Sequence, residues 1–520
     1  MKRFWLGIGL MMPVAAVFAA DPMQLGVDLG MSGTLGTGWS GIDGGQTSNA
    51  STKETITAYG KSEFIDAVAQ MSANNDGVYG SDIANFSTTK QLFNNYFYLE
   101  QGYTQFHFNP LQFQIGRYVQ KDEFDSPYSL FLNSRGLSAL GMRIRYEDDF
   151  FAYESRWISL DSNSNFGSVS ATPPAWQYTW NSSSNAYTHT GTGFPDRGAN
   201  LKTFLFKFDK LHVGLQDSAV YTGRSFDPEY FFSPIPEYFT QYFKTTDGRP
   251  WSTSGNENNL IGFFVTYTQP EYDWGAQVLI DDFSLHFLLP SLVPDNPWKA
   301  AWTVGGRVQT SLGRFGLYHA GALKYTFEPI TTEVGQDRTT AYGYTYYPDV
   351  EYSVDGSFRT MAIIDNAVGY QYGENNLAVR ATYDNTIGPG LGFDTNLELV
   401  VAGNNSPANP WQDATASNNV GTHWLDDPVL QRAIAWSGDL KWHFHDWDVS
   451  GGWTMGYIGN LLMTEDPSGI TGTPGTNGDS ALDTLVKIFK PSSSNKAFVN
   501  VTVGFTYHYD VSPAPRSGGQ

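Results

Sequence analysis

Alternating side chains near the carboxyl end of the chain constrain its fold most strongly. Residues 499–510 read VNVTVGFTYHYD, so valine, phenylalanine and tyrosine occupy one parity, while most positions of the other parity are polar or glycine. A period of two over a dozen residues indicates a β-strand with one apolar and one polar face. Because the apolar face ends in aromatic rings, its solvent is either a protein core or a lipid bilayer.

The amino-terminal segment favours export to a bilayer. Residues 1–20 begin with a basic pair, continue with an apolar run over 4–18 and end with the small-residue pattern of residues 17–19, VFA. This arrangement is typical of a cleaved secretory signal peptide, and the run is short for a membrane-spanning helix. We therefore expect a mature chain that is periplasmic, secreted or inserted in the outer membrane.

Composition narrows the class of protein further. The chain has 520 residues, no cysteine and a net charge of −21, and 15% of its residues are aromatic. The lack of cysteine excludes disulfides and thiol chemistry, and the negative charge argues against nucleic acid as a partner. A long exported chain rich in tyrosine, phenylalanine, tryptophan and glycine fits an outer-membrane β-barrel with aromatic girdles.

The alternation recurs along the chain and predicts about 18 strands, with 16 as the alternative. Short turns alternate with long loops, as in barrels whose turns face the periplasm and whose loops face outward. In this interpretation 36–90 forms one long loop, and a strand at about 340–352 is needed to keep the alternation in phase. Helical spacing predicts short helices at 61–71 and 481–490 that cap or plug the barrel.

Charged side chains on the inward parity are the first candidate site. Arg143 and Arg145 precede a turn, and Glu154 and Arg156 follow it, so opposite charges can meet across this hairpin. Two roles remain open for them. They form a structural set of ion pairs that stiffens the lumen, or they form a constriction that selects solutes by charge.

Aromatic rings in the long loops are the second candidate site. Rings beside amide and acidic groups suit neutral sugars, which need a flat apolar surface and hydrogen-bond acceptors. The alternative is that the same rings belong to the interfacial girdle. The candidates are Trp176, Tyr178, Trp180, Tyr230, Phe231, Tyr238 and Tyr242.

Catalytic and metal-binding patterns are weak in this sequence. It contains no nucleophile elbow, zinc-protease helix or phosphate-binding loop. His443 and His445 share one strand parity beside acidic residues, but the spacing fixes no third ligand. We therefore expect no enzyme activity, no cofactor and no metal.

Several passages resemble the Wzi-type capsule-assembly family of outer-membrane barrels. They are IGRYVQKDEFDSPYSLFLNSRGLSAL, KLHVGLQDSAVYTGR, NNLIGFFVTYT with WGAQVLIDDF, and KAAWTVGGRVQTSL with FGLYHAGALKYTFEP. The resemblance implies an 18-stranded barrel that binds surface polysaccharide rather than conducting solutes. By position, Arg117, Asp281 and Asp282 look like the family's charged strand ends.

The sequence as a whole predicts one all-β domain, a transmembrane antiparallel barrel over 21–510, followed by a disordered tail at 511–520. The expected partners are outer-membrane lipid, surface polysaccharide and the barrel-assembly machinery, which would engage the C-terminal strand. The alternative function is a porin or substrate-specific channel, for which the acidic balance predicts a preference for cations.

Overall fold

The computed structural model describes most of the chain. The described residues are 24–42, 47–76, 95–160, 178–181, 186–189, 196–244, 257–282, 297–327, 343–346, 351–354, 357–360, 366–405, 421–465 and 488–511. The expected signal peptide at 1–20 lies outside these residues, as does the expected tail beyond Val511.

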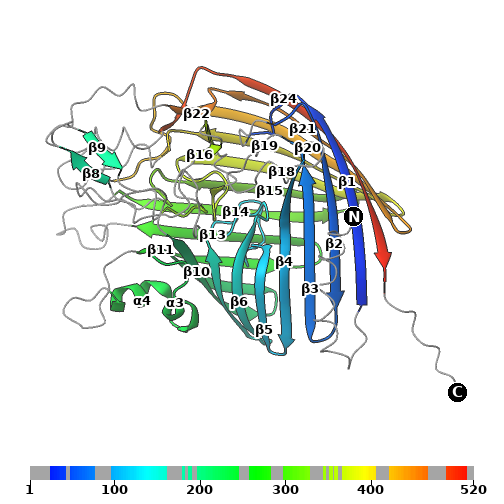
Figure 1. Ribbon diagram of the computed structural model, residues 1–520, viewed down its shortest axis with the longest axis horizontal. Helices are drawn as coiled ribbons and strands as arrows, with labels where there is room; N and C mark the ends of the chain where they lie inside the picture. The colour runs from blue at the N-terminus through cyan, green and yellow to red at the C-terminus, as the bar shows by residue number, and fades with distance from the viewer. Residues whose placement is uncertain are drawn as a thin grey trace.

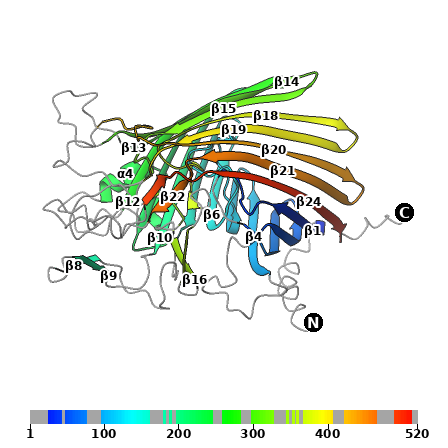
Figure 2. The same cartoon turned by 90° about the horizontal axis from the view of Figure 1, so that it is seen from above.

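The fold is a closed 18-stranded antiparallel β-barrel, which confirms the predicted fold class and strand number. Each strand pairs with its sequence neighbours in the barrel, and the first strand pairs with the last to close the sheet (Figures 1 and 2). The strands are β1 (Gln24–Gly36), β2 (Ala50–Lys61), β3 (Ile65–Asn74), β4 (Tyr96–Phe108), β5 (Leu111–Val119), β6 (Ser138–Glu147), β7 (Phe151–Ser159), β10 (Arg197–Phe208), β11 (Leu211–Thr222), β12 (Glu257–Thr268), β13 (Tyr272–Asp282), β14 (Lys299–Thr310), β15 (Gly313–Ala322), β18 (Asn376–Gly388), β19 (Leu391–Ala402), β20 (Gln431–Phe444), β21 (Trp447–Gly459) and β24 (Lys496–Asp510).

The remaining elements are short and belong to the loops. Two helices, α3 (Pro228–Phe232) and α4 (Glu237–Lys244), follow β11. Three small hairpins lie outside the barrel sheet: β8 (Tyr178–Asn181) with β9 (Ala186–His189), β16 (Glu351–Val354) with β17 (Ser357–Thr360), and β22 (Leu462–Glu465) with β23 (Ile488–Pro491). Among the described residues no helix is long and apolar enough to cross a membrane.

Connections at the two ends of the barrel differ in length. At one end, the turn end, the strands are joined by short turns such as 109–110, 209–210 and 445–446. At the other, the loop end, the connections are long, for example 120–137, 223–256 and 323–375. The start of β1 and the finish of β24 both lie at the turn end, because Gly26 pairs with Asp510. This is the expected arrangement of short turns and long loops.

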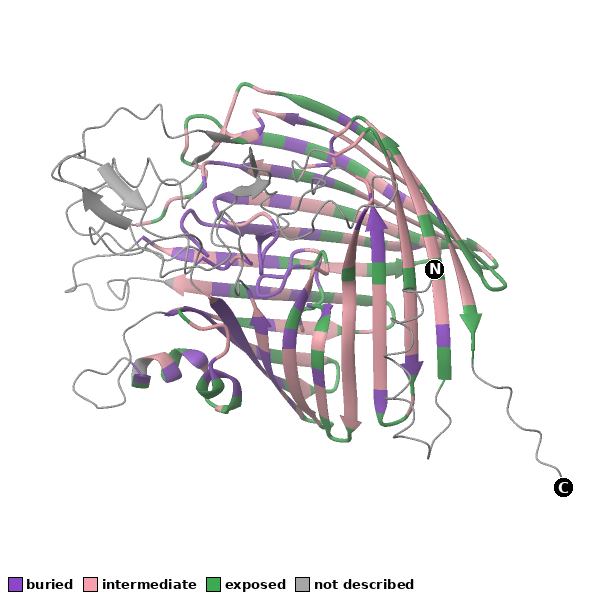
Figure 3. Cartoon of the chain, in the orientation of Figure 1, coloured by how far each residue is buried: buried purple, intermediate pink, exposed green. Residues whose placement is uncertain are grey.

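Exposed and less exposed residues alternate along many of the strands (Figure 3). In β24, Val501, Val503 and Phe505 are about half exposed on the outer face, while Phe498 points inward and is buried. Large exposed apolar residues recur at the outward positions of the other strands. A soluble monomer rarely exposes so much contiguous apolar surface. The fold therefore implies a lipid environment around the barrel.

Four details of the sequence prediction need correction. Residues 36–90 are not one loop, because they contain β2 and β3. The expected helix at 61–71 is wrong, since 65–74 form strand β3 paired with β2 and β4. Residues 343–346 lie in a loop and 351–354 in the β16–β17 hairpin, so 340–352 is not a barrel strand. Most of the expected helix at 481–490 lies outside the described residues, and its last residues belong to β23.

The outward face of β24 gives a direct test of the lipid environment. We expect Val503→Arg to destabilise the assembled barrel by about 2–4 kcal/mol, because a cation near the middle of the bilayer loses its hydration. The matched variant Thr502→Arg places the same group toward the lumen and should cost clearly less. Urea titration of the barrel in lipid vesicles measures both. Equal costs for the two variants would contradict the assignment of the outer face.

Candidate functional site

The loop that joins β5 to β6 folds back into the barrel. Within residues 120–137, which we call the inner loop, Tyr128, Leu130, Phe131 and Leu132 are fully buried. They belong to one apolar cluster with inward residues of the strands from β6 to β24, but of none from β1 to β5. Much of the lumen near the loop end is therefore filled by the chain itself.

One carboxylate holds the fold of the inner loop. Asp122 Oδ2 accepts hydrogen bonds from the backbone N–H groups of Phe131 and Leu132, both at 3.1 Å. Its Oδ1 accepts from the side chain of Gln216 on β11 at 2.7 Å. Burial raises the pKa of the Asp122 carboxyl, while these hydrogen bonds act in the opposite direction. Asp122, near the start of the inner loop, therefore ties residues 131–132 of the same loop to the barrel wall.

Side chains of the barrel wall bind the inner loop, and a glycine of the wall leaves space for it. Gln277 on β13 accepts the N–H of Leu130 at 2.8 Å, and Tyr128 Oη donates to Glu398 on β19 at 2.7 Å. Gly275 points into the lumen, where a Cβ atom would lie 2.6 Å from the ring of Phe124. A side chain at Gly275 would thus displace the inner loop.

Parts of the long connection between β15 and β18 pack against the inner loop. Tyr344 Oη donates to the carbonyl of Phe131 at 2.8 Å, and the N–H of Tyr370 donates to the carbonyl of Leu130 at 3.1 Å. Asn133 N–H donates to the carbonyl of Val368 at 2.7 Å. Two connections distant in sequence therefore form one packed unit inside the barrel.

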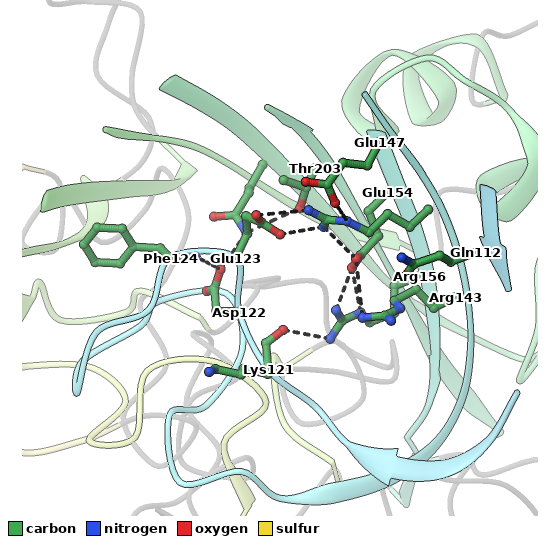
Figure 4. Close-up of polar contacts among 12 residues, drawn as sticks. Gln112, Lys121, Asp122, Glu123, Phe124, Arg143, Glu147, Glu154, Arg156 and Thr203 are labelled. Atoms are coloured by element: carbon green, nitrogen blue, oxygen red, sulfur yellow. Dashed lines mark hydrogen bonds and ion pairs between the residues drawn. The ribbon is translucent and has the colours of Figure 1, made fainter. Parts of the chain in front are cut away.

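The four lumen charges predicted from sequence come together on β6 and β7 (Figure 4). Glu154 lies 2.6 Å from Arg156, 3.3 Å from Arg145 and 3.9 Å from Arg143. Arg145 also pairs with Glu123 of the inner loop at 2.6 Å. The cluster therefore ties the inner loop to the wall through compensated charges.

A cavity remains on the side of the barrel opposite this charge cluster. Its volume is about 720 Å³, and it lies between the inner loop and the wall of β14, β15 and β18 to β21. At the loop end it reaches Ser40 and Arg135, and toward the turn end it reaches Asp384. Hydroxyl, amide and charged groups line much of it, including Asn133 and Gln371.

A second cavity continues along the same wall toward the turn end. Its volume is about 450 Å³, and Asp384 lines both cavities. Asp394 and Lys441, which are 3.2 Å apart, lie at its lower part near the turns. The two cavities together extend from the loop end to the neighbourhood of the turns, along one side of the lumen.

Charges of both signs border these cavities. Arg380 pairs with Glu398 at 2.7 Å, and Arg307 pairs with Asp273 at 3.0 Å. Such a lining offers donors and acceptors to a polar solute without a field of single sign.

The loop aromatics predicted from sequence do not form one surface. Tyr230 and Phe231 are enclosed between α3 and the barrel wall, so a ligand cannot stack on them in this arrangement, whereas Tyr238 is exposed. The structure describes the backbone of Tyr178 and Trp180 in β8 and of Tyr242 in α4, but not their side chains. Trp176 lies outside the described residues.

The strand-end charges lie in different environments. Arg117 points outward on β5 and donates to the carbonyl of Ser138 at 3.1 Å. Asp281 accepts the N–H of Phe327 at 2.8 Å, and Asp282 follows a bulge in β13 opposite Lys299. Asp281 thus fixes the start of the connection between β15 and β18, while Arg117 contributes to the outer surface.

The paired histidines of the sequence separate in the structure. His443 Nδ1 lies 2.7 Å from Asp448 on the lumen side of the turn end, whereas His445 occupies the turn itself. Within the described residues, no group of three or more histidine, aspartate or glutamate side chains could hold a metal ion.

Sequence reasoning missed the inner loop. Its signal is the run YSLFL at 128–132, which does not alternate and is followed within a few residues by Gly136. The four large apolar side chains of this run cannot face water at low cost, so they require a core. In a barrel, that core is inside the lumen.

The chain matches several solved structures at low sequence identity. No protein-family model and no curated protein matches the chain. Wzi of Escherichia coli, an outer membrane protein involved in group 1 capsule assembly and a carbohydrate-binding β-barrel, is 12% identical with a TM-score of 0.47, and the match covers 92% of this chain and 83% of Wzi. Acinetobacter baumannii OccAB4 and Pseudomonas aeruginosa OpdK, the latter solved with vanillate, are each 10% identical with TM-scores of 0.44, over 94% of this chain and 98% of theirs.

The role of Asp122 can be tested by removing its carboxylate. Asp122→Ala leaves the buried N–H groups of Phe124, Phe131 and Leu132 without acceptors, each costing about 1–3 kcal/mol. We therefore expect the inner loop to loosen while the barrel remains assembled. Hydrogen exchange at residues 126–132 should rise. The control Asp125→Ala removes an exposed carboxylate of the same loop and should leave the exchange unchanged. Equal exchange in both variants would contradict this role.

Proposed function

We propose that the protein is a non-catalytic outer-membrane barrel of a diderm bacterium that admits small hydrophilic solutes along one side of its lumen. The observation that carries this proposal is the pair of cavities that meet at Asp384. Together they extend between the loop end and the turn end beside a packed inner loop. A passage lined in this way would select among solutes where each must exchange its water for wall groups.

The chemistry of the lining indicates the class of solute. Hydroxyl groups such as those of Thr382 and Ser437, which are only partly buried, suit the hydroxyls of a small sugar or a similar polar molecule. Paired charges such as Arg380 and Glu398 also present groups of both signs. We therefore favour a small solute rich in hydrogen-bonding groups over a large apolar one.

A charge reversal at the junction of the cavities tests the passage. Asp384→Lys changes the local charge by two units, worth about 0.8 kcal/mol at about 10 Å in water. We expect cation permeability to fall and anion permeability to rise about fourfold each, so that their ratio falls roughly sixteenfold. Reversal potentials of single channels in a planar bilayer with a salt gradient measure this ratio.

Asp149→Lys is the matched control for that experiment. Asp149 is exposed in the turn between β6 and β7, away from both cavities, and its reversal adds the same net charge. The control should leave the permeability ratio close to that of the unaltered protein. If both variants changed the ratio equally, the cavities would not be the conducting path.

A second candidate function is the binding of surface polysaccharide, as the Wzi-type resemblance implies. The apolar cluster around Leu130 and Phe131 favours it, because a filled lumen suits a protein that binds rather than conducts. The ligand would then contact the long loops at the loop end, which carry the predicted aromatic residues. In either function, insertion would depend on the barrel-assembly machinery acting on the C-terminal strand.

The polysaccharide candidate predicts a loss of binding when loop rings are removed. We expect Trp176→Ala combined with Trp180→Ala to reduce retention of surface polysaccharide from the same cell by roughly tenfold or more, since each stacked ring contributes about 0.5–1.5 kcal/mol. Heat-modifiable migration of the barrel in gels should not change. Unaltered retention would assign these rings to the interfacial girdle.

Conductance of the unaltered protein decides between the two functions. Steady ion-selective steps in a planar bilayer would support the channel. A silent barrel that retains the polysaccharide would support the binding protein and contradict the channel.

A further inference from the structure

Residues 223–244 form a small folded unit on the outside of the barrel wall, which we call the outer lobe. It contains α3 and α4 and lies beside the loop-end part of β10 and β11 (Figure 1). Outward side chains of β7 hold it, since Ser155 Oγ donates to the carbonyl of Phe231 at 2.6 Å and Tyr153 Oη donates to that of Ser233 at 3.2 Å. The outer lobe therefore covers wall that would otherwise face the membrane.

Helix α4 buries its polar face and exposes its apolar face, the reverse of a surface helix in a soluble protein. Glu237, Thr240 and Lys244, which are spaced along one side of the helix, are buried against the barrel. Phe239 and Phe243, one helical turn apart, are 49% and 58% exposed. A water-exposed helix would bury its rings and expose its charges. This distribution instead suits a helix whose outer side contacts an apolar solvent.

Polar groups of the wall compensate the buried charges of the outer lobe. Lys202 on β10 lies 3.4 Å from Glu237, and Asp217 on β11 accepts the N–H of Tyr238 at 3.0 Å. Lys202, Asp217 and Glu237 are all fully buried. These wall residues occupy outward positions, where a charge facing lipid would be costly. The outer lobe shields them from the lipid.

The first helix of the outer lobe is anchored in the same way. Asp227 caps the amino end of α3 by accepting the N–H of Glu229 at 3.0 Å, and it also pairs with Lys244 at 2.6 Å. Arg224 bridges Asp227 and Glu257, the first residue of β12. Because these contacts join both helices to the wall, the outer lobe has a defined orientation.

The apolar outer face of the barrel continues across the outer lobe. Below it, toward the turn end, the outward residues of β10 and β11 include exposed Phe206, Phe208 and Val213. Where the lobe covers the wall, the outward residues include the charged Lys202 and Asp217. The outer lobe supplies the missing apolar surface with exposed side chains, namely Phe232, Ile235, Tyr238, Phe239 and Phe243.

We propose that the outer lobe is an interfacial anchor whose exposed rings insert into the outer leaflet of the membrane, at the boundary between headgroups and acyl chains. This proposal rests on the membrane location of the barrel. Lipid fits this face better than a protein partner because the face extends the lipid-facing surface of neighbouring strands. A tyrosine such as Tyr238 suits the same depth, since its ring is apolar and its hydroxyl is polar.

Single cysteine probes can test this placement, because the chain contains no cysteine. Phe239→Cys labels the outer lobe, Phe263→Cys labels the outward face of β12 within the barrel, and Leu312→Cys labels an exposed turn. Each variant is labelled with a nitrobenzoxadiazole dye and inserted into phosphatidylcholine vesicles that contain lipids with nitroxide groups at shallow or deep positions. These residues are exposed, so the replacements leave the packing of the barrel intact.

We expect the dye at residue 239 to be quenched by lipid, more strongly by the shallow than by the deep nitroxide. The dye at residue 263 should be quenched by the deep nitroxide, and the dye at residue 312 should show little quenching. Strong quenching at 263 with none at 239 would overturn the anchor while leaving the barrel in the membrane. Absence of quenching at both positions would contradict the membrane location itself.

Protein concentration separates lipid from a second copy of the chain as the occupant of this face. An apolar environment shifts the emission of the dye to shorter wavelength, a blue shift. For a lipid anchor, this blue shift and the quenching of the dye at residue 239 should not change when the ratio of protein to lipid is lowered tenfold. A blue shift that disappears on dilution, without quenching by either nitroxide, would assign the face to self-association and overturn the proposal.

Discussion

The pairing of β1 with β24 is the constraint on which the rest of the structure depends. It closes the sheet, so that no strand is left with unpaired backbone donors and acceptors at an edge. In lipid this closure is essential, because no water is present to satisfy such groups. Closure also determines that one face of each strand contacts lipid and the other faces the lumen. Outward positions such as Val503 must suit lipid, and inward positions such as Thr502 can carry polar groups.

A barrel of 18 strands encloses more space than its inward side chains fill. The inner loop fills part of that space, and individual hydrogen bonds and ion pairs hold it there. Asp122 satisfies the backbone donors of Phe131 and Leu132 inside the lumen, and Glu154 compensates the arginines that surround it. Two cavities remain on the opposite side. Their shape is set by where the inner loop does not pack, so the same contacts that stabilise the fold also define these cavities.

Strand alternation correctly predicted the barrel and its number of strands, because each strand has one polar and one apolar face. It also predicted the inward cluster of Arg143, Arg145, Glu154 and Arg156. The prediction failed where the two faces of a strand differ little in polarity. The outward positions of β3 include alanines at 67 and 69, so the sequence resembles a helix. Residues 340–352 alternate, yet Tyr344 and Tyr346 are buried in a loop that packs inside the lumen. The predicted total of about 18 agrees with the structure, although β2 and β3 were not predicted and 340–352 was counted as a strand. The position of both chain ends at the turn end requires only that the number be even.

The aromatic loops show why a functional site is harder to predict than a strand. Tyr230, Phe231 and Tyr238 follow one another closely in sequence, but the first two rings are buried against the barrel and the third is exposed. Their sequence pattern is equally compatible with sugar binding, an interfacial girdle or packing. What separates these roles is the side of the barrel on which the segment lies, and tertiary contacts such as Lys202 with Glu237 decide that side. Once the polar side of α4 faces the wall, its rings must face outward, toward whichever solvent surrounds the barrel at that height.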